Sequence, residues 1–300
     1  LFYIFIFFYS NSNAATIYDF QIENLISNHL NLIQKNNEKI PIEYSVILDE
    51  NPNAFINEKR KLFITTGLLK YAPSYKALLG VLAHELGHLK NFHITKRIDS
   101  IKKINTINQL SNISLIATSI LSNNSDYLVQ SLITNQANIK NYYSHFSREQ
   151  EREADAFAAD KLKELNISSD DLIKFLTFLE KKSFEKGLNE DDYKFSSHPI
   201  YEERYKILQN KENNEYKFEQ NSLSIDFSFS KAKLFGFTSQ NENEFYNYLE
   251  GDYYNYANSI LLSRKGKLKD SLKILNNIIS KFPKHIFLIE TKADLLLSHG

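Results

Sequence analysis

His84, Glu85 and His88 are the residues of this sequence whose types and spacing have the clearest chemical meaning. They lie in the apolar segment VLAHELGHLK, and Ser74 upstream is a plausible N-cap, so the pattern predicts a helix. Histidines four positions apart project from one helix face, and both rings can reach a tetrahedral ion at about 2.0–2.1 Å. Glu85 is rotated by about 100° around the helix axis from His84. Its carboxylate is therefore better placed to contact a water bound to the ion than to bind the ion itself. The HExxH spacing therefore predicts one Zn²⁺ per chain, held by His84 and His88, with Glu85 as the general base of peptide hydrolysis.

A catalytic zinc site needs a third protein ligand, and the carboxylates of the segment SREQEREAD at 147–155 are the candidates. Glu149, Glu151 and Glu153 alternate there, and the physical argument alone does not choose among them. Glu151 and Asp155 are four apart and share a face, which could supply one ligand and one carboxylate behind a ligating histidine. The alternative is a solvated helix start, where acidic residues favour the positive end of the helix dipole.

The other histidines give weaker signals. His93 comes five positions after His88, and continuing the helix would turn it away from the metal-binding face. His198 lies in the turn-like segment SSHP, six positions before Arg204, and is either a loop histidine at the site or without a role. The histidines without any partner pattern are predicted to be surface or structural residues: His29, His145, His285 and His299.

Several further elements must position these residues. Gly87 costs the helix about 1 kcal/mol relative to Ala, so we expect a tight contact there with a sheet or a substrate. Residues 210–245 are polar and carry no clear pattern. Periodicity and turn residues predict the following: a helix over 17–34, a strand over 42–48, extended pieces at 54–56 and 62–65 forming a hairpin, one or two amphipathic helices within 101–140, a helix from Ser147 with a capping box, and a helix over 172–179.

The two ends of the chain differ from its centre. Leu1–Tyr9 is an unbroken apolar run followed by small residues, which predicts the remnant of a signal peptide over 1–15; a buried strand is the alternative. From residue 251 onward, paired short helices carry small residues and a proline near the positions typical of tetratricopeptide (TPR) repeats, and we expect the array to continue beyond Gly300. The domains we expect are a remnant at 1–15, a protease domain at 16–215, a connection at 216–250 and repeats at 251–300.

Composition excludes several classes of function. The chain has no Cys, so thiolate zinc sites, cysteine nucleophiles and disulfides are excluded. Its 36 basic and 36 acidic residues give a net charge of zero, which argues against a nucleic-acid partner.

Taken together, these blocks resemble the zinc metallopeptidase family that includes the CAAX prenyl protease and HtpX, and within it the soluble, exported, TPR-containing BepA/YfgC-like branch. The resemblance covers about residues 17 to 300. The blocks that carry it are NAF at 53–55, TGLL at 66–69, VLAHELGH at 81–88, SR with Glu151 and AD within 147–155, and HP at 198–199 with Arg204. It implies a mostly helical α+β fold, with a zincin-type (gluzincin-like) domain and a small sheet.

The resemblance also implies residue roles. Glu151 corresponds to the third zinc ligand, Asp155 to the carboxylate behind a ligand, and Arg204 to a residue beside the site. His198 corresponds to a histidine that stabilises the oxyanion or caps the zinc at rest. The family commonly has a Pro-Gly-Gly-like turn after the NAF block, where this chain has NEKR at 57–60, so the hairpin departs from the family pattern at this turn.

The function that we expect is that of an endopeptidase. Its substrate would bind extended along the edge strand near residues 53–56, with Asn53, Ala54 and Phe55 as the substrate-binding residues. The resemblance implies a periplasmic enzyme that cleaves misfolded or stalled envelope proteins, with the repeats docking a client or the outer-membrane assembly machinery. Residues 101–140 could cover the site or touch a membrane surface. The alternatives are a chaperone or adaptor with a latent protease, and a general extracellular peptidase whose repeats only stabilise the fold.

Overall fold

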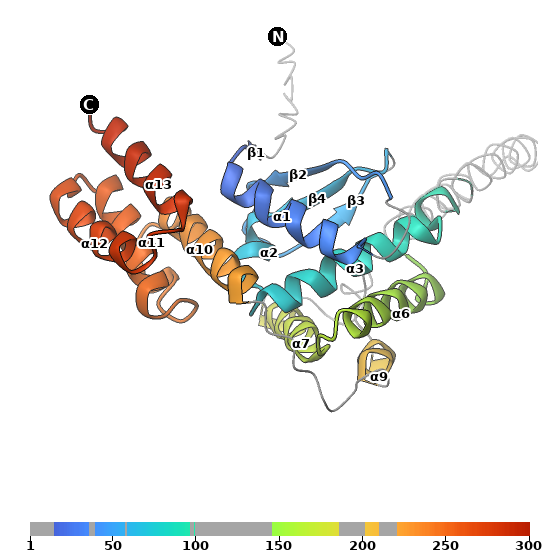
Figure 1. Cartoon of the computed structure of the whole chain (residues 1–300). Coiled ribbons are helices and arrows are strands. Elements are labelled where there is room, and N and C mark those ends of the chain that lie inside the picture. Colours follow the sequence, from blue (N-terminus) through green and yellow to red (C-terminus); the bar gives the residue numbers. More distant parts are fainter. Residues whose placement is uncertain are drawn as a thin grey trace, which may run out of the picture.

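The chain folds as a mostly helical α+β protein with a small four-stranded sheet (Figure 1). The computed structural model describes residues 15–35, 40–57, 59–96, 99, 146–185, 202–209 and 221–300. The strands are β1 (Thr16–Ile17), β2 (Tyr44–Ile47), β3 (Ala54–Ile56) and β4 (Leu62–Thr65). The helices are α1 (Phe20–Ile33), α2 (Thr66–Tyr71), α3 (Tyr75–Lys90), α6 (Arg148–Glu164), α7 (Asp170–Glu185), α9 (Glu202–Gln209), α10 (Asn221–Thr238), α11 (Gly251–Arg264), α12 (Leu268–Lys281) and α13 (Ile286–Leu297), with a short 3-10 turn at Glu242–Glu244.

The sheet has the order β1-β2-β4-β3, so β3 lies at one edge. β2 and β4 run parallel, whereas β1 pairs antiparallel with β2 and β3 pairs antiparallel with β4. The predicted strands and hairpin agree with β2, β3 and β4. The prediction of a helix from residue 17 is wrong at its start, because 16–17 form β1 and α1 begins at Phe20. Asp19 sets that start, since its side chain accepts a hydrogen bond from Ile22 N at 3.0 Å.

The β3–β4 hairpin closes through Asn57. Its Oδ1 accepts hydrogen bonds from the backbone N–H groups of Lys59 and Lys61, both at 3.0 Å. Arg60 adopts a left-handed backbone with φ of 63°, a conformation that glycine adopts without the steric cost other residues carry. The turn is therefore tight although it has no glycine, and the asparagine side chain supplies hydrogen bonds that hold it.

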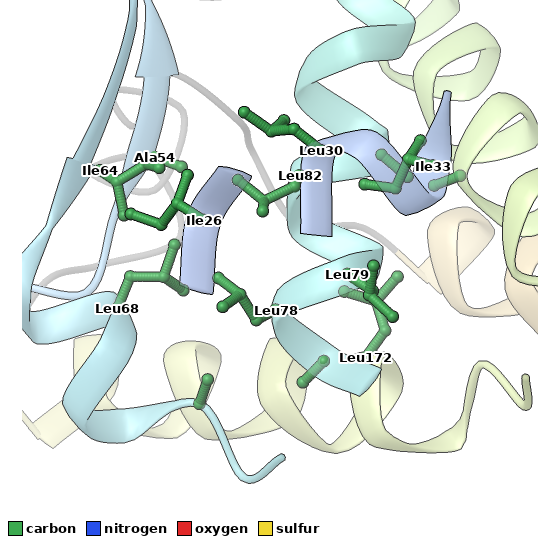
Figure 2. Packing of buried hydrophobic residues seen from close by; sticks show 14 of the residues in the cluster. Ile26, Leu30, Ile33, Ala54, Ile64, Leu68, Leu78, Leu79, Leu82 and Leu172 are labelled. Atoms are coloured by element: carbon green, nitrogen blue, oxygen red, sulfur yellow. The ribbon is translucent and has the colours of Figure 1, made fainter. Parts of the chain in front are cut away.

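The main hydrophobic core lies between α1, the sheet, α3 and α7 (Figure 2). α3 is central to it: it packs against α1 and β3 on one side and against α6 and α7 on the other (Figure 1). Figure 2 shows how apolar side chains from these elements meet, among them Ile26, Leu30, Ile64, Leu68, Leu78, Leu82 and Leu172. The helix with the HExxH residues is thus held in the centre of the domain.

α10 falls within residues 210–245, which the sequence left unassigned. Phe227 and Leu234 join the main core, while Phe229 and Phe235 join a second core with α11, α12 and α13. A helix buried on opposite sides lacks the single apolar stripe that marks an amphipathic helix. The predicted pair of helices, turn and third helix after residue 251 agree with α11, α12 and α13.

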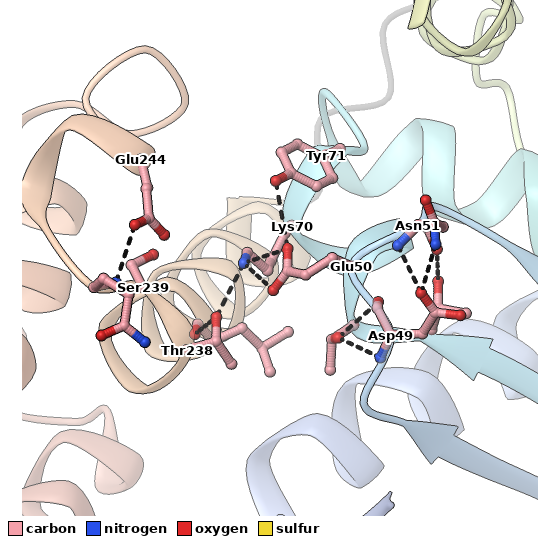
Figure 3. A network of polar contacts seen from close by, with 12 residues as sticks. Asp49, Glu50, Asn51, Lys70, Tyr71, Thr238, Ser239 and Glu244 are labelled. Carbon is pink, nitrogen blue, oxygen red and sulfur yellow. Dashed lines mark hydrogen bonds and ion pairs between the residues drawn. The ribbon is translucent and has the colours of Figure 1, made fainter. Parts of the chain in front are cut away.

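Buried lysines fasten α10 to the main domain. Lys70 of α2 donates to the carboxylate of Glu50 at 2.7 and 2.8 Å and to Thr238 Oγ1 of α10 at 3.0 Å (Figure 3). Lys231 Nζ donates to the backbone oxygen of Ala72 at 3.0 Å. Lys233 Nζ lies 2.7 Å from Asp19 Oδ2 at the start of α1. These contacts link α10 to α2 and to the start of α1.

Several predictions fall on residues outside the described ranges. These are residues 1–14 of the signal-peptide remnant predicted at 1–15, the amphipathic helices within 101–140, and His145 and His198. In the described part of the chain, no helix combines the length and apolar character that crossing a bilayer requires.

Candidate metal centre

Side chains from α3 and α6 converge on one buried point. The Nε2 atoms of His84 and His88 lie 3.0 Å apart, and each is 3.4 Å from a carboxylate oxygen of Glu151. All three residues are buried. A tetrahedral zinc ion with bonds of about 2.0–2.1 Å separates its ligand atoms by about 3.3–3.4 Å. The three side chains therefore fit such an ion in both donor type and spacing, and they form the candidate metal-binding group of the described residues.

Local sequence signals determine where α3 and α6 begin. Ser74 caps α3 by accepting hydrogen bonds from the backbone N–H groups of Lys76 and Ala77. Ser147 caps α6 in a reciprocal capping box with Gln150, at 3.2 and 2.9 Å. Both caps agree with the predicted helix starts. They set the residues at which the two helices begin.

Gly87 determines how closely α3 approaches α6. A Cβ atom at this position would lie 3.0 Å from Ala154 Cα, 3.2 Å from Ala154 O and 3.2 Å from Phe157 Cβ. The expected tight contact exists, but the expectation that it would be with a sheet or a substrate is wrong. Its partner is α6, because the carboxylate of Glu151 reaches the histidines only if the two backbones are close.

Asp155 and Arg204 support His84. His84 Nδ1 lies 2.8 Å from Asp155 Oδ1, so the ring donates to the carboxylate through the nitrogen that faces away from Glu151. Arg204 of α9 donates to the same carboxylate from Nε at 2.7 Å and from Nη2 at 2.8 Å. Its Nη1 is 3.2 Å from Glu151 Oε2. One guanidinium therefore holds both carboxylates of α6 that face the histidines.

The buried charges shift the acidity of these groups. Burial alone would lower the pKa of His84, but the carboxylates of Asp155 and Glu151 outweigh it and raise the pKa to about 9. Burial would raise the pKa of Asp155, yet Arg204 first and His84 second lower it below the usual value. Asp155 is thus an anion at neutral pH and a strong acceptor for His84.

His88 has a different support. Its Nδ1 lies 2.9 Å from His93 Nδ1, and its ring stacks on Phe146 with centroids 3.8 Å apart. His93 Nε2 in turn lies 2.8 Å from Glu153 Oε2. Burial lowers the pKa of His93, and the contact with Glu153 offsets this only in part.

The sequence reasoning missed the contact between His93 and His88 because it extended the helix past its end. α3 ends at Lys90, and Phe92 has a left-handed backbone with φ of 58° that interrupts the helix before the helical residues 93–96. His93 is therefore outside the three-residue group but against the ring of one of its members. Asn91 is a residue type that often follows a helix end, and it was the available signal.

The remaining candidates are placed as follows. Glu85 is buried in α3, only 2% exposed. Asn53 is exposed and precedes the edge strand β3, in which Ala54 faces the core and the ring of Phe55 stacks on Phe63 at 5.2 Å. β3 packs beside α3, so the predicted substrate strand and the histidine helix are neighbours.

The histidines without a predicted partner are also accounted for where the structure describes them. His29 is fully buried in α1, with Nδ1 2.7 Å from Leu25 O, and burial lowers its pKa to about 4. His285 and His299 lie at the two ends of α13, far along the chain from the metal-binding group. Glu149, one of the three alternating glutamates, is exposed and pairs with Arg152.

Comparison with known proteins agrees with this arrangement. The chain is 20% identical over 302 residues to a beta-barrel assembly-enhancing protease of Yersinia pestis, an alignment that covers 96% of this chain and 61% of that protein. The chain therefore spans less than two thirds of the length of this curated relative. The sequence profile of peptidase family M48 matches residues 19–212, which include both helices of the candidate site. This chain belongs to peptidase family M48.

Proposed function

We propose that the chain is a zinc-dependent metalloendopeptidase that cleaves misfolded or stalled envelope proteins during outer-membrane protein assembly. The single observation that carries the zinc chemistry is the convergence of His84, His88 and Glu151 at tetrahedral ligand spacing. Two imidazole nitrogens and one carboxylate form a donor set that catalytic zinc sites use, with a further position left for water or substrate. Membership of a metallopeptidase family supports the same conclusion.

The proposed roles follow from where each side chain lies. His84, His88 and Glu151 would hold one Zn²⁺. The ion, when bound, would lower the pKa of a water towards about 7 and polarise the scissile carbonyl. Glu85, on the same helix as both histidines, would take the proton from that water and pass it to the leaving amine. Asp155 would keep the proton of His84 on Nδ1, which leaves Nε2 free to bind the ion.

Substrate would bind along β3. This strand is at the edge of the sheet and pairs on one side only, with β4, among the described residues. An extended peptide can add to such an edge through backbone hydrogen bonds, beside the helix that carries the histidines. Asn53, Ala54 and Phe55 are the residues of this segment that we propose contact the substrate. His198 is proposed to approach the carbonyl oxygen or to cap the zinc at rest.

The proposed role in the cell envelope rests on separate observations. The name of the Yersinia pestis relative, beta-barrel assembly-enhancing protease, supports it. The apolar run Leu1–Tyr9 and the small residues after it support export to the periplasm. We propose that α11, α12 and α13 belong to a TPR array that docks unfolded clients or the assembly machinery, and that 101–140 makes peripheral contact with a membrane.

Replacing Glu85 tests the enzyme directly. Purified Glu85→Gln should bind zinc with the same stoichiometry as wild type and lose at least about 100-fold in the cleavage rate of an unfolded substrate such as casein, because it lacks the general base. Metal content by atomic absorption and cleavage by gel densitometry give the two readouts. Glu85→Gln protein that still cleaves at the wild-type rate would overturn the assignment.

The same assay separates the enzyme from a chaperone or adaptor. If wild type with added zinc cleaves no unfolded client, while wild type and Glu85→Gln prevent its aggregation equally, the protease proposal fails. For the envelope role, a denatured outer-membrane β-barrel protein should be cleaved faster than a denatured cytosolic protein of similar size. Equal rates would favour a general peptidase.

A further inference from the structure

A second chain of polar contacts runs behind His88, on the side away from Glu151. His88 Nδ1 meets His93 Nδ1 at 2.9 Å, and His93 Nε2 meets Glu153 Oε2 at 2.8 Å. His88 and His93 are fully buried, whereas the side chain of Glu153 is 43% exposed. The proposed reaction makes no use of His93 or Glu153.

Only one placement of protons suits both contacts and a metal-binding His88. Nε2 of His88 faces His84 and Glu151, so it must be unprotonated to bind an ion. Neutral His88 then carries its proton on Nδ1 and donates it to His93 Nδ1. His93 consequently carries its own proton on Nε2 and donates it to Glu153. The reverse arrangement would put the proton of His88 on Nε2, where it would point at the other ligands.

We infer that His93 and Glu153 are positioning residues that hold His88 in its metal-binding tautomer and orientation; this inference rests on the proposed zinc function. The two histidine ligands are then supported in different ways. Asp155 contacts His84 directly and is itself held by Arg204. His88 instead contacts His93, and His93 in turn contacts the partly exposed carboxylate of Glu153.

The backbone explains how His93 reaches this place. Because α3 ends at Lys90 and Phe92 is left-handed, His93 does not continue the register of α3, and its ring lies against that of His88. Glu153 comes from α6, so the contact also spans the two helices that carry the metal-binding group. A purely structural role for His93 is the competing explanation, because its ring also lies 6.3 Å from that of Phe146 in the same cluster.

The test measures zinc affinity of the full chain by competition with a chromophoric chelator. His93→Phe keeps an aromatic ring and removes both hydrogen bonds, and Glu153→Gln removes the charge. Loss of such outer contacts typically weakens metal binding by about 10- to 100-fold, so His93→Phe should fall in this range and Glu153→Gln near its lower end. Glu149→Gln is the matched control, since it removes an exposed carboxylate from the same helix, and its zinc affinity should equal that of wild type.

The double variant separates positioning from packing. If Glu153 acts through His93, adding Glu153→Gln to His93→Phe should weaken zinc binding no further. An undiminished second loss, or a Glu153→Gln affinity equal to that of Glu149→Gln, would overturn the inference. Should His93→Phe fail to fold, judged by the melting temperature of chelator-treated protein, the comparison of Glu153→Gln with Glu149→Gln decides alone.

Failure of the inference is distinct from failure of the zinc function. Wild type that binds zinc and cleaves substrate, beside variants of unchanged zinc affinity, refutes only the positioning role. Wild type that binds no zinc refutes both.

Discussion

Asp155 is the residue on which the polar contacts of the candidate centre depend. It receives the Nδ1–H of His84 at 2.8 Å and two donors of Arg204 at 2.7 and 2.8 Å, all in a buried environment. A buried carboxylate is costly unless it is paired and hydrogen-bonded. Asp155 meets both conditions, and the arginine that stabilises it also reaches Glu151. Through Arg204, Asp155 therefore links the orientation of the proposed ligand His84 to the charge of the proposed ligand Glu151.

Substitution of Asp155 should weaken metal binding more than substitution of an exposed carboxylate on the same helix does. We expect Asp155→Asn to weaken zinc binding by about 10- to 100-fold, because His84 loses the anionic acceptor that fixes its tautomer. Competition with a chelator measures this, and the melting temperature of the chelator-treated protein reports on folding separately. Asp160→Asn, which removes an exposed carboxylate from the same helix, is the control. Equal affinities for the two variants would contradict the proposed role of Asp155.

At the scale of elements, the packing of α3 on α6 brings the two halves of the centre together. Gly87 allows the approach, because any side chain there would meet the backbone of Ala154. α3 has a second glycine, Gly80, whose added Cβ would meet mainly the side chain of Leu172, at 2.8 Å from its Cδ2 atom. The end of this leucine side chain can rotate away, and its Cβ atom, at 3.1 Å, belongs to α7, which carries none of the proposed ligands. The backbone of α6, by contrast, cannot move without shifting Glu151.

These two glycines give a matched pair of variants. Each substitution by Ala gains about 1 kcal/mol of helix propensity, but Gly87→Ala overpacks the helix interface at a cost of about 1–3 kcal/mol. We expect Gly87→Ala to lower the free energy of unfolding by up to about 2 kcal/mol and to weaken zinc binding, while Gly80→Ala leaves zinc affinity unchanged. Urea unfolding and chelator competition measure the two quantities. Gly87→Ala protein with the zinc affinity of Gly80→Ala would show that the helix spacing does not control the centre.

At the scale of the whole molecule, α10 joins the peptidase domain to the C-terminal helices. Its two apolar sides belong to different cores, and the buried lysines Lys231 and Lys233 attach it to α2 and to the start of α1 (Figure 3 shows the neighbouring contact of Lys70 with Thr238). The C-terminal helices therefore contact the domain largely through a helix that is itself part of the main core, and Phe287 of α13 also lies 6.0 Å from Phe20 of α1, ring centroid to ring centroid.

Lys231 gives this junction a pH dependence. Burial lowers its pKa from 10.5 to about 8 in the folded chain. Between these values the unfolded chain binds more protons than the folded one, so this lysine makes the free energy of unfolding rise with pH from about 8 to about 10.5. Below about pH 8 the cost of burying the charged amine is fully present.

We expect Lys231→Met to remove that rise. The difference in the free energy of unfolding, variant minus wild type, should therefore be larger at about pH 7 than at about pH 9.5. Urea unfolding of both proteins at both pH values measures this difference. Lys269→Met, an exposed substitution on α12, controls for loss of a positive charge. Parallel stability curves for wild type and Lys231→Met across this range would contradict the prediction.

The sequence by itself determined the features that depend on neighbours along the chain. The spacing of His84, Glu85 and His88, the caps Ser74 and Ser147, and the shared face of Glu151 and Asp155 are all local, and helical geometry converts them into directions. It left three glutamates open as third ligand until a family resemblance favoured Glu151. The role of each of these residues in catalysis stays a prediction for the experiments above.

Only the tertiary structure decided which distant groups meet. It put Gly87 against α6 rather than a sheet, placed His93 against His88, and gave α10 two buried sides that show no periodic pattern. Each outcome depends on packing between segments that are far apart in the chain or on a backbone turn at a single residue. Periodicity and capping are properties of one segment, whereas these contacts are set by the sum of many weak interactions among several segments, and a local pattern does not contain that sum.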